Sequence, residues 1–482
     1  MNELVRVAAR SIGATDCVSV RKCPDGMYNK CFILTMDDRQ EVIAKVPNPN
    51  AGVSHYTTAS EVATMDFARD TLHAPLPKVY AWNSRADDAV GAEYIIMQKM
   101  PGVQLSEVWR NMKLADKMKL CLNLALVQEK FLSVSFRLFG GLYYKHDLDL
   151  QSDPDDKWLY TNEKGEKVHD GRFAIGPMTG RDWSDWPTPS DYHKAIGLRE
   201  LTAIRSLSPP LSKQTVMVCG PGLYRPEVVK KLSAIESYLR IHDALLPPTS
   251  HDPAINITAS TLWHNDLHEE NIFVDRENPT RIVGIIDWQS VGDLLPLFNH
   301  TLQPAFVQYS SGPMPETLEP PELADISGLL PEEQTRATAE YFEKALFIAW
   351  LKIARKKLPA AYRAFEYQKQ TANPAFDLVT LAGRLFEFGE AHVHALPFPL
   401  AFDDASLPII EDDCERAMYG MEIMNDFKAR LGPLWPDKGA VSHELYDETK
   451  KALRELKSEI IDTFAASPEE RAEFEELWPF DD

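Results

Sequence analysis

The first hundred residues alternate between apolar and polar positions, a pattern typical of antiparallel strands that bury one face. The strands expected from this alternation are residues 18–21, 30–36, 41–47, 78–82 and 93–97. Turn-forming residues separate them, as in Pro24-Asp25-Gly26. The N-terminal part is therefore predicted to contain a small antiparallel sheet.

One helix is expected inside this sheet region. Residues 60–69 place Val62, Met65 and Phe67 at helical spacing, so one face of the helix can join the core. Ser60 is the residue type that caps a helix, and it places Glu61 in the first turn.

After the break at Pro101-Gly102 the spacing of apolar residues becomes helical, which predicts a boundary between two lobes. The helical regions expected are residues 105–137, 225–246, 333–358, 374–394, 411–431 and 444–475. Residues 140–189 instead read as a long acidic and aromatic loop region. Its tryptophans and carboxylates suit a cationic or ring-bearing substrate, or they form a surface loop packed by its own aromatic residues.

The strongest chemical signal lies around two short apolar runs, residues 272–274 and 282–286, which predict a hairpin. Asp266 and Asn271 precede the first run, and Asp287 ends the second. Phosphoryl transfer needs one carboxylate that orients and deprotonates a hydroxyl, plus an amide and a second carboxylate that hold Mg²⁺ on nucleotide phosphates. These residues therefore predict Asp266 as the catalytic base and Asn271 and Asp287 as metal ligands.

Lys45 lies in the strand 41–47, on the face opposite Ala44. A lysine at such a position either covers a solvated strand face or pairs with nucleotide phosphates and a helix carboxylate. Glu61 is the expected carboxylate, with Asp66 as the alternative.

Zinc is not expected at the two histidines of the same region. His264 and His268 are four positions apart, but the H-E-x-x-H order is absent and no cysteine lies nearby.

The string His264-Asn265-Asp266-Leu267-His268 and the string Ile285-Ile286-Asp287-Trp288-Gln289 resemble those of kinase-like small-molecule phosphotransferases, the aminoglycoside phosphotransferase and choline kinase group. Further segments, at residues 140–144, 172–177 and 477–480, resemble a fungal branch of the phosphotransferase enzyme family. This resemblance implies an α+β, protein-kinase-like bilobal fold, with a small antiparallel-sheet N-lobe and a large, mainly helical C-lobe.

The resemblance also implies a nucleotide site for ATP and Mg²⁺. Gly26 and Asn29 match the loop that covers the phosphates in these relatives, although Asp25 stands where their first glycine does. The strand that precedes Pro101 would then line the adenine pocket, through Met97, Gln98 and Met100.

Three domains follow from these patterns: residues 1–100 as the N-terminal lobe, 101–400 as the catalytic lobe with a substrate-loop insert at about 140–200, and 401–482 as a helical extension. The expected function is transfer of the ATP γ-phosphate to a hydroxyl of a small molecule, such as a cationic, amino-alcohol or sugar compound. The alternatives are a catalytically silent kinase-like module that binds nucleotide or acts as a scaffold, and a protein kinase, although the H-R-D, D-F-G and A-P-E motifs are absent.

The composition of the chain argues against some classes of binding partner and favours some cellular locations. A net charge of −21 argues against nucleic acid and anionic membranes, and no apolar run reaches the roughly 18 residues of a membrane span. Six cysteines without a C-x-x-C pair are typical of a reducing compartment. A cytoplasmic location is expected, with a mitochondrial one as the alternative because Arg6 and Arg10 lie in an Ala/Val-rich start. The oligomeric state is left open.

Overall fold

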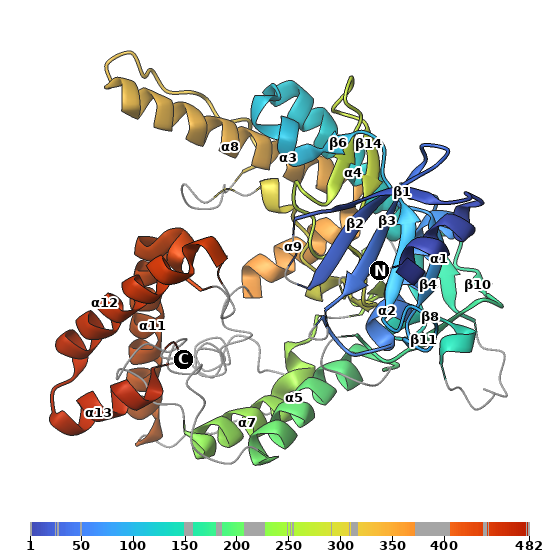
Figure 1. Ribbon diagram of the computed structural model, residues 1–482. Coiled ribbons are helices and arrows are strands. Elements are labelled where there is room, and N and C mark those ends of the chain that lie inside the picture. Colours follow the sequence, from blue (N-terminus) through green and yellow to red (C-terminus); the bar gives the residue numbers. More distant parts are fainter. Residues whose placement is uncertain are drawn as a thin grey trace. The chain divides into compact units, whose positions relative to one another are not determined.

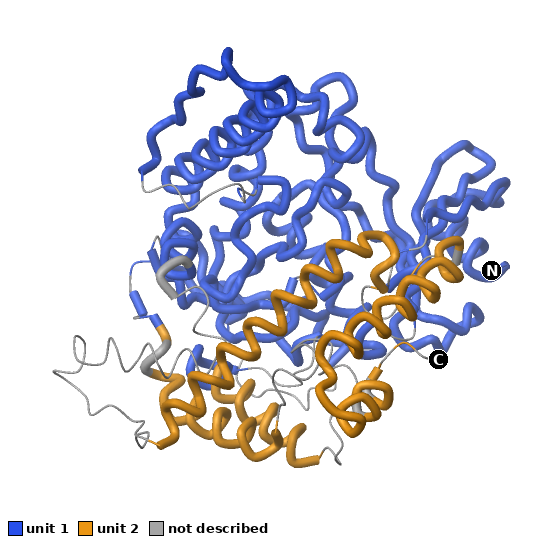
Figure 2. The backbone as a smooth tube through the Cα atoms, turned by 90° about the vertical axis from the view of Figure 1, so that its left-hand side faces the viewer, with its two compact units in different colours: residues 1–192, 247–370 blue, residues 193–246, 371–482 orange. Residues whose placement is uncertain are grey.

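The computed structural model of the 482-residue chain describes residues 2–482 except 25, 27, 49–50, 149–157, 180–185, 207–226, 248, 251, 253–254, 291, 308, 310–316, 372–404, 437–440, 442, 479 and 481–482. The chain divides into two compact units, residues 1–192 with 247–370 and residues 193–246 with 371–482 (Figure 2). The expected boundary at residue 400 lies outside the described residues, and the three-domain division stays a prediction.

A five-stranded antiparallel sheet forms the N-terminal part of the first unit (Figure 1). Its order is β1-β2-β3-β5-β4, from β1 (Cys17–Lys22), β2 (Asn29–Met36), β3 (Glu41–Pro47), β5 (Tyr94–Gln98) and β4 (Val79–Asn83). One face of the sheet packs against α1 (Asn2–Ile12) and buries Leu34, Val42 and Ala44 with Leu4 of the helix. The predicted strands are thus confirmed.

The opposite face of the sheet is less completely covered. Strand alternation places Ile43, Lys45 and Met97 on this face, and the register pairs Ile43 with Met97 and Lys45 with Ile95. Ile43 and Met97 are half-buried, whereas Lys45 is buried. This face therefore combines apolar surface with one buried cation.

The helix expected at residues 60–69 begins earlier than predicted. α2 spans Tyr56–Asp66 and continues as a five-residue π-helix, η1 (Phe67–Thr71). Ser60 is therefore not its cap, and Glu61 lies in the second turn. The sequence did not mark this start because α2 is buried on nearly all sides, so it lacks a clear polar face.

The C-terminal lobe of the first unit is built around short strands and two long helices. Its hairpin β13 (Ile272–Val274) and β14 (Ile282–Ile285) pairs with β6 (Val103–Gln104), which confirms the predicted hairpin. Other elements are α3 (Leu105–Val108), η2 (Trp109–Asn111), α4 (Leu114–Phe131), β12 (Ser260–Thr261), β15 (Leu295–Pro296), η4 (Leu297–Asn299), η5 (Ala305–Val307), α8 (Pro331–Lys357) and α9 (Pro359–Thr371). The helix expected at 374–394 lies outside the described residues.

Two expectations for the region after α4 are corrected. Residues 134–136 form a strand, β7 (Val134–Phe136), instead of the end of a helix. The region expected to be a loop contains β8 (Gly141–Tyr144), η3 (Lys145–Asp147), β9 (Tyr160–Asn162), β10 (Lys167–Val168) and β11 (Phe173–Gly176). These strands are two to four residues long, too short for a periodic pattern to reveal them, and they pair only through the fold, as β8 does with β11 and β7 with β9 and β12.

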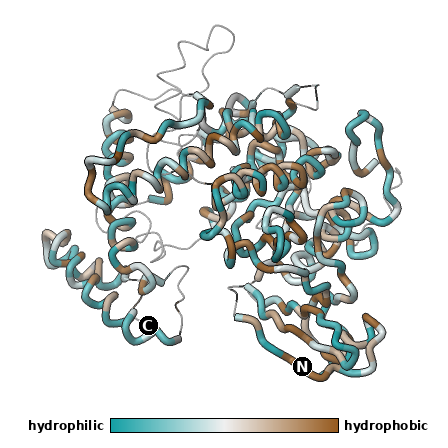
Figure 3. The backbone as a smooth tube through the Cα atoms, turned by 90° about the horizontal axis from the view of Figure 1, so that it is seen from above, coloured by the Kyte–Doolittle hydropathy of each residue, from teal (hydrophilic) through white to brown (hydrophobic). Residues whose placement is uncertain are grey.

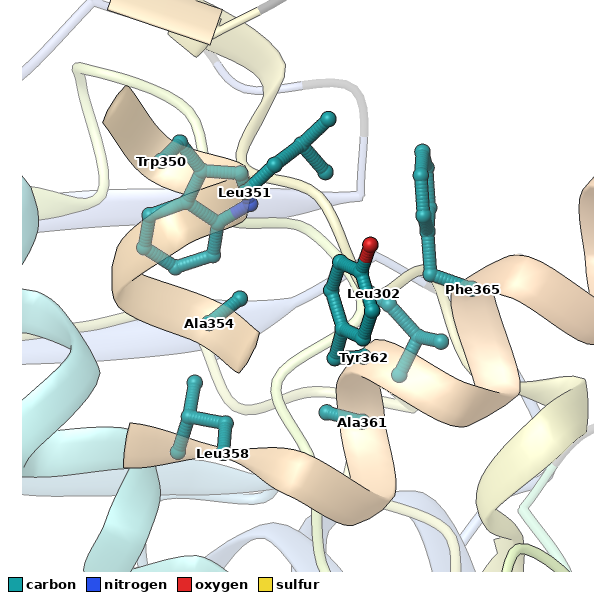
Figure 4. Close-up of a pocket in the computed structure, with 8 residues that line it drawn as sticks. All are labelled: Leu302, Trp350, Leu351, Ala354, Leu358, Ala361, Tyr362 and Phe365. Atoms are coloured by element: carbon teal, nitrogen blue, oxygen red, sulfur yellow. The ribbon is translucent and has the colours of Figure 1, made fainter. Parts of the chain in front are cut away.

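The angle between α8 and α9 is filled by apolar side chains (Figure 4). Leu302, Trp350, Leu358 and Phe365 are among the residues that surround a cavity of about 10 Å³, the size of a single water molecule. This part of the lobe is a packed core.

The second unit consists of helices with a core of their own. They are α5 (Pro189–Ser206), which begins in the first unit, α7 (Val228–Leu245), α11 (Ser406–Leu431), η6 (Gly432–Leu434), η8 (His443–Leu445), α12 (Tyr446–Phe464) and α13 (Pro468–Leu477). Phe427, Leu453, Ile460 and Trp478 are buried together. Apolar and polar residues are mixed along the chain toward the C-terminus (Figure 3), as predicted for helices with one exposed face.

The first unit has the kinase-like arrangement expected from the resemblance: a small antiparallel-sheet lobe joined to a lobe that is mainly helical. The joint passes through Gly102, whose φ of +85° lies in the left-handed region. Among the described residues, no helix has the length and apolar character to cross a membrane.

Candidate active site

The site is organised around a buried cation. The Nζ atom of Lys45 lies 2.7 Å from Oε1 of Glu61 and 3.0 Å from Oδ1 of Asp287. Lys45 and Glu61 are each only 3% exposed, whereas the Asp287 side chain is 45% exposed. The sheet, α2 and the segment that follows β14 thus meet at one ammonium group. Asp66, the alternative partner, accepts a hydrogen bond from Tyr144 instead.

The two carboxylates keep Lys45 charged. Burial on its own lowers the pKa of the ammonium, but Glu61 and Asp287 outweigh burial and raise the pKa above its usual range. Partial burial acts to raise the pKa of Asp287, and the positive charge of Lys45 overcomes this and lowers it. Asp287 is therefore an anion at neutral pH, as a metal ligand must be.

The loop of residues 264–271 carries the other two predicted residues, Asp266 and Asn271. Asn271 is 5% exposed, and its Nδ2 donates to the main-chain oxygen of Asp266 at 3.0 Å. The amide N–H of Ile286 donates to the carbonyl of Asn271 at 3.0 Å, which joins this loop to the residue before Asp287. The carboxylate of Asp266 is 58% exposed, so a substrate can reach it.

His264 holds this loop together, a role that the sequence did not suggest. Its Nε2 donates to the carbonyl of Ile286 at 2.9 Å, and its Nδ1 accepts from the amide of Asp266 at 3.3 Å. Burial lowers the pKa of His264, so the neutral ring can play both roles at once. His264 thus connects the catalytic loop to the main chain beside Asp287.

The loop before β2 is tied to the hairpin by another residue that sequence reasoning missed. Gln289 accepts from Nδ2 of Asn29 at 2.7 Å and donates to the carbonyl of Ala51 at 2.6 Å. The glutamine and the asparagine are 260 positions apart, and only their position beside predicted site residues could have indicated the contact. Gly26 is exposed, and its expected main-chain contact with phosphate stays a prediction.

The residues expected to line the adenine pocket have different surroundings. Met97 is half-buried on the same sheet face as Lys45. Gln98 accepts from the amide of Lys78 at 3.3 Å, so its side chain is committed to the sheet edge. Met100 is 8% exposed and packs against Gly284 of the hairpin, where an added Cβ would lie 2.5 Å from the methionine. Their roles toward a nucleotide stay predictions.

The described aromatic residues of the 140–200 insert pack against the protein itself. Tyr144 stacks with Trp82 and Phe173, with ring centroids 6.1 Å and 5.2 Å apart. Trp158 is covered by Lys167, whose Nζ lies 3.9 Å from the ring centroid. For these residues the self-packed alternative is favoured over a substrate surface. Residues 181–185, which include Trp183, lie outside the described residues.

One further pocket is lined by none of these residues. A cavity of about 640 Å³ is lined by residues of η1, the end of α4 and the β9–β10 hairpin, among them Leu72, Lys130 and Tyr160. No group of three His, Cys, Asp or Glu side chains that could hold a metal occurs among the described residues. Asp287 and Asn271 provide the oxygen ligands that Mg²⁺ prefers, so the residues present fit that ion.

Comparisons with known proteins give one family model and several similar proteins. The model of the phosphotransferase enzyme family matches residues 19–298, more than half of the chain. A subtelomeric hrmA-associated cluster protein of Aspergillus fumigatus is 31% identical over 352 residues, which cover 64% of this chain and 64% of that protein. The altered inheritance of mitochondria protein 9 of Lachancea thermotolerans is 26% identical over 319 residues, 59% of this chain and 48% of that protein. The chain thus spans less than two thirds of these relatives.

Solved structures with a similar chain course include a putative aminoglycoside phosphotransferase from Ralstonia eutropha, with 14% identity and a TM-score of 0.38 over 88% of this chain and 98% of that one. A putative fructosamine-3-kinase from Thermobifida fusca has 11% identity and a TM-score of 0.39 over 87% of this chain and 99% of that one.

Proposed function

The chain belongs to the phosphotransferase enzyme family, and from that premise we propose that it is an ATP-dependent kinase that phosphorylates a hydroxyl group of a small molecule. The observation that carries this proposal is the contact of Lys45 with both Glu61 and Asp287. Burying a lysine beside two carboxylates costs desolvation free energy, because the charges lose hydration, so such a group is weak evidence for a purely stabilising role. A nucleotide site gives each of them a role.

Asp266 would act on the acceptor. Its exposed carboxylate accepts a hydrogen bond from the substrate hydroxyl and aligns it with the γ-phosphorus. The hydroxyl oxygen then forms the new P–O bond, the bond between the γ-phosphorus and the β–γ bridging oxygen breaks, and ADP leaves. The hydroxyl proton passes to the Asp266 carboxylate as the bond forms.

Lys45, Asn271 and Asp287 would act on the nucleotide. Lys45 neutralises charge on the α- and β-phosphates, while Glu61 fixes its position from α2. Asp287 and the amide oxygen of Asn271 would hold Mg²⁺, which supplies charge neutralisation on the phosphates when bound. A main-chain hydrogen bond from Ile286 to Asn271, which joins the two segments that carry these side chains, supports this assignment.

A cationic or amino-alcohol acceptor, or a sugar, remains the substrate class proposed. The net charge of −21 supports a cation over a phosphorylated acceptor, since an acidic protein attracts positive ligands. A cytoplasmic location is proposed, with the mitochondrion as the alternative, because yeast relatives are named as mitochondrial proteins.

The proposal is tested by turnover. ATP with Mg²⁺ would be offered with amino alcohols, sugars, aminoglycosides and a peptide library, and ADP release measured. We expect a small hydroxylated compound to be phosphorylated, and Asp266→Asn to lower kcat by about 10² with ATP affinity nearly unchanged. Asp275→Asn, a matched change at an exposed turn of the same hairpin, should leave kcat as in the parent.

The outcomes separate the alternatives. Mg-ATP binding without turnover on any acceptor would favour the silent module, and phosphorylation of peptides alone would favour a protein kinase. Turnover of Asp266→Asn within a few-fold of the parent would exclude the role given to Asp266.

A further inference from the structure

Gln289 lies two positions after Asp287 and reaches away from the hairpin toward the sheet lobe. Between them Trp288 is buried at 1% exposure, and its ring centroid lies 4.7 Å from that of His264 in an edge-on arrangement. The tryptophan thus fixes the main chain in the C-terminal lobe, while the next side chain extends out of it. Gln289 is half-buried.

The amide group of Gln289 bonds to two loops of the sheet lobe at once. Its Oε1 accepts from Asn29, at the start of β2, and its Nε2 donates to the carbonyl of Ala51, between β3 and α2. These two loops also meet directly, because the amide of Asn48 donates to the carbonyl of Tyr28 at 2.8 Å. The side chain of Gln289 therefore connects its own segment, which follows Asp287, with the segments that contain Asn29 and Ala51.

Asn29 depends on this contact. Its Oδ1 is buried without a hydrogen-bond partner among the described residues, so the bond from Nδ2 to Gln289 fixes the orientation of its side chain. Asn29 belongs to the loop that is expected to cover the nucleotide phosphates. Its position is thus set by a residue of the opposite lobe.

We propose that Gln289 is a positioning residue that closes the phosphate-covering loop onto the segment carrying Asp287, so that the phosphate and metal contacts form together. This inference rests on the proposed function. Gln289 touches neither the acceptor nor the reacting atoms; it acts through Asn29 and Ala51.

The chemistry of the side chain supports this role. One contact needs an acceptor and the other a donor, and an amide provides both on adjacent atoms. Glutamate would lose the donor, and leucine, of similar volume, would lose both. Loss of both bonds leaves the fold of each lobe intact but separates the loop from the metal-binding segment.

The test compares two ligands by calorimetry. Binding of Mg-ATP is expected to depend on the phosphate-covering loop, whereas binding of adenosine, which has no phosphate, is not. If Gln289 positions this loop, its substitution should therefore weaken only the binding of Mg-ATP. We expect Gln289→Leu to weaken Mg-ATP binding by about tenfold, which corresponds to the loss of one or two net hydrogen bonds, and to leave adenosine binding unchanged. Gln334→Leu, at a half-buried glutamine of α8 that donates to the carbonyl of Leu329 just before the helix, is the matched control and should bind both ligands as the parent does.

A second variant tests the connection itself. Asn29→Ala should weaken Mg-ATP binding, and adding it to Gln289→Leu should cause little further loss, because both remove the same link. Three outcomes would overturn the inference. Gln289→Leu could bind Mg-ATP as tightly as the parent, or it could lose as much affinity for adenosine as for Mg-ATP. The double variant could also lose the full sum of the two single losses in Mg-ATP affinity. A parent that does not bind Mg-ATP would overturn the proposed function and this inference with it.

Discussion

Lys45, Glu61 and Asp287 form an asymmetric group, because Glu61 is buried whereas Asp287 is partly exposed. Glu61 balances the lysine charge inside the protein, and its removal leaves the buried cation with only the partly exposed Asp287 as a partner. Asp287 can exchange its contact with Lys45 for one with a ligand. The proposed structural and ligand-binding roles are thus divided between two carboxylates that contact one ammonium group.

This division predicts the effect of Asp287→Ala. Lys45 keeps Glu61 as its partner, so we expect the fold to persist while Mg²⁺ no longer tightens ATP binding. The measurement is the ATP dissociation constant with and without Mg²⁺. The assignment of Asp287 is wrong if Mg²⁺ strengthens ATP binding in the variant as much as in the parent.

Buried histidines give stability a pH dependence. Burial lowers the pKa of His300 from 6.5 to about 4, where its Nε2 lies 3.1 Å from the carbonyl of Thr261. Because the folded pKa is below the unfolded one, the unfolded chain binds more protons between these pH values, and stability falls as pH drops from about 6.5 to about 4. A pKa difference of this size corresponds to a loss of about 3 kcal/mol in the free energy of unfolding once the histidine is protonated in both states.

We therefore expect the urea concentration at the unfolding midpoint of the parent to decrease when the pH is lowered from 7.5 to 5. In His300→Gln this decrease should be smaller. His146→Gln, at a side chain that is 72% exposed, is the control. Parallel curves for His300→Gln and parent would contradict the prediction.

At the scale of elements, the connection between the lobes leaves no room for a side chain at Gly102. Gly102 follows the last strand of the sheet and precedes β6, which pairs with β13 of the catalytic hairpin. An added Cβ at Gly102 would lie 2.1 Å from the carbonyl oxygen of Val274. The hinge and the hairpin are thus in backbone contact, and the glycine makes this contact possible.

Gly102→Ala is expected to destabilise the first unit by about 3 kcal/mol, through the positive φ and the clash with main chain together. Gly165→Ala is the matched control, because Gly165 also has a positive φ (+77°) but has no atom near its Cβ position. It should cost about 1 kcal/mol. The measurement is the shift in thermal unfolding, and equal shifts would show that the contact with Val274 has no effect.

At the scale of the whole molecule, the two compact units have different cores. The proposed nucleotide residues, from Gly26 to Asp287, all belong to the first unit. The core of the second unit is formed by residues of α11, α12 and the C-terminal segment, such as Phe427, Leu456 and Trp478.

A ligand of the first unit should therefore stabilise that unit selectively. Mg-ATP at 100 times its dissociation constant is expected to stabilise it by about 2.7 kcal/mol. Hydrogen exchange of β3 and β13 amides should slow on addition of Mg-ATP, while that of α12 should not change. Equal slowing in β3, β13 and α12 would contradict this prediction.

The sequence alone determined the parts of this protein that depend on local pattern. Alternation predicted the five strands of the sheet and placed Lys45 opposite Ala44, and two apolar runs predicted the hairpin that carries Asn271 and Asp287. Such patterns are local because side chains alternate at every second residue of a strand. The pairing of Lys45 with Glu61 also followed from residue type and spacing.

Only the tertiary structure decided what depends on distant contacts. The start of α2 at Tyr56 has no sequence signal because the helix is buried on nearly all sides. The short strands of the 140–200 region form only through their partners, and the links made by His264 and Gln289 join backbone and side chains far apart in the chain. Hydrogen bonds of this kind follow from where the folded elements meet, which no local periodicity encodes.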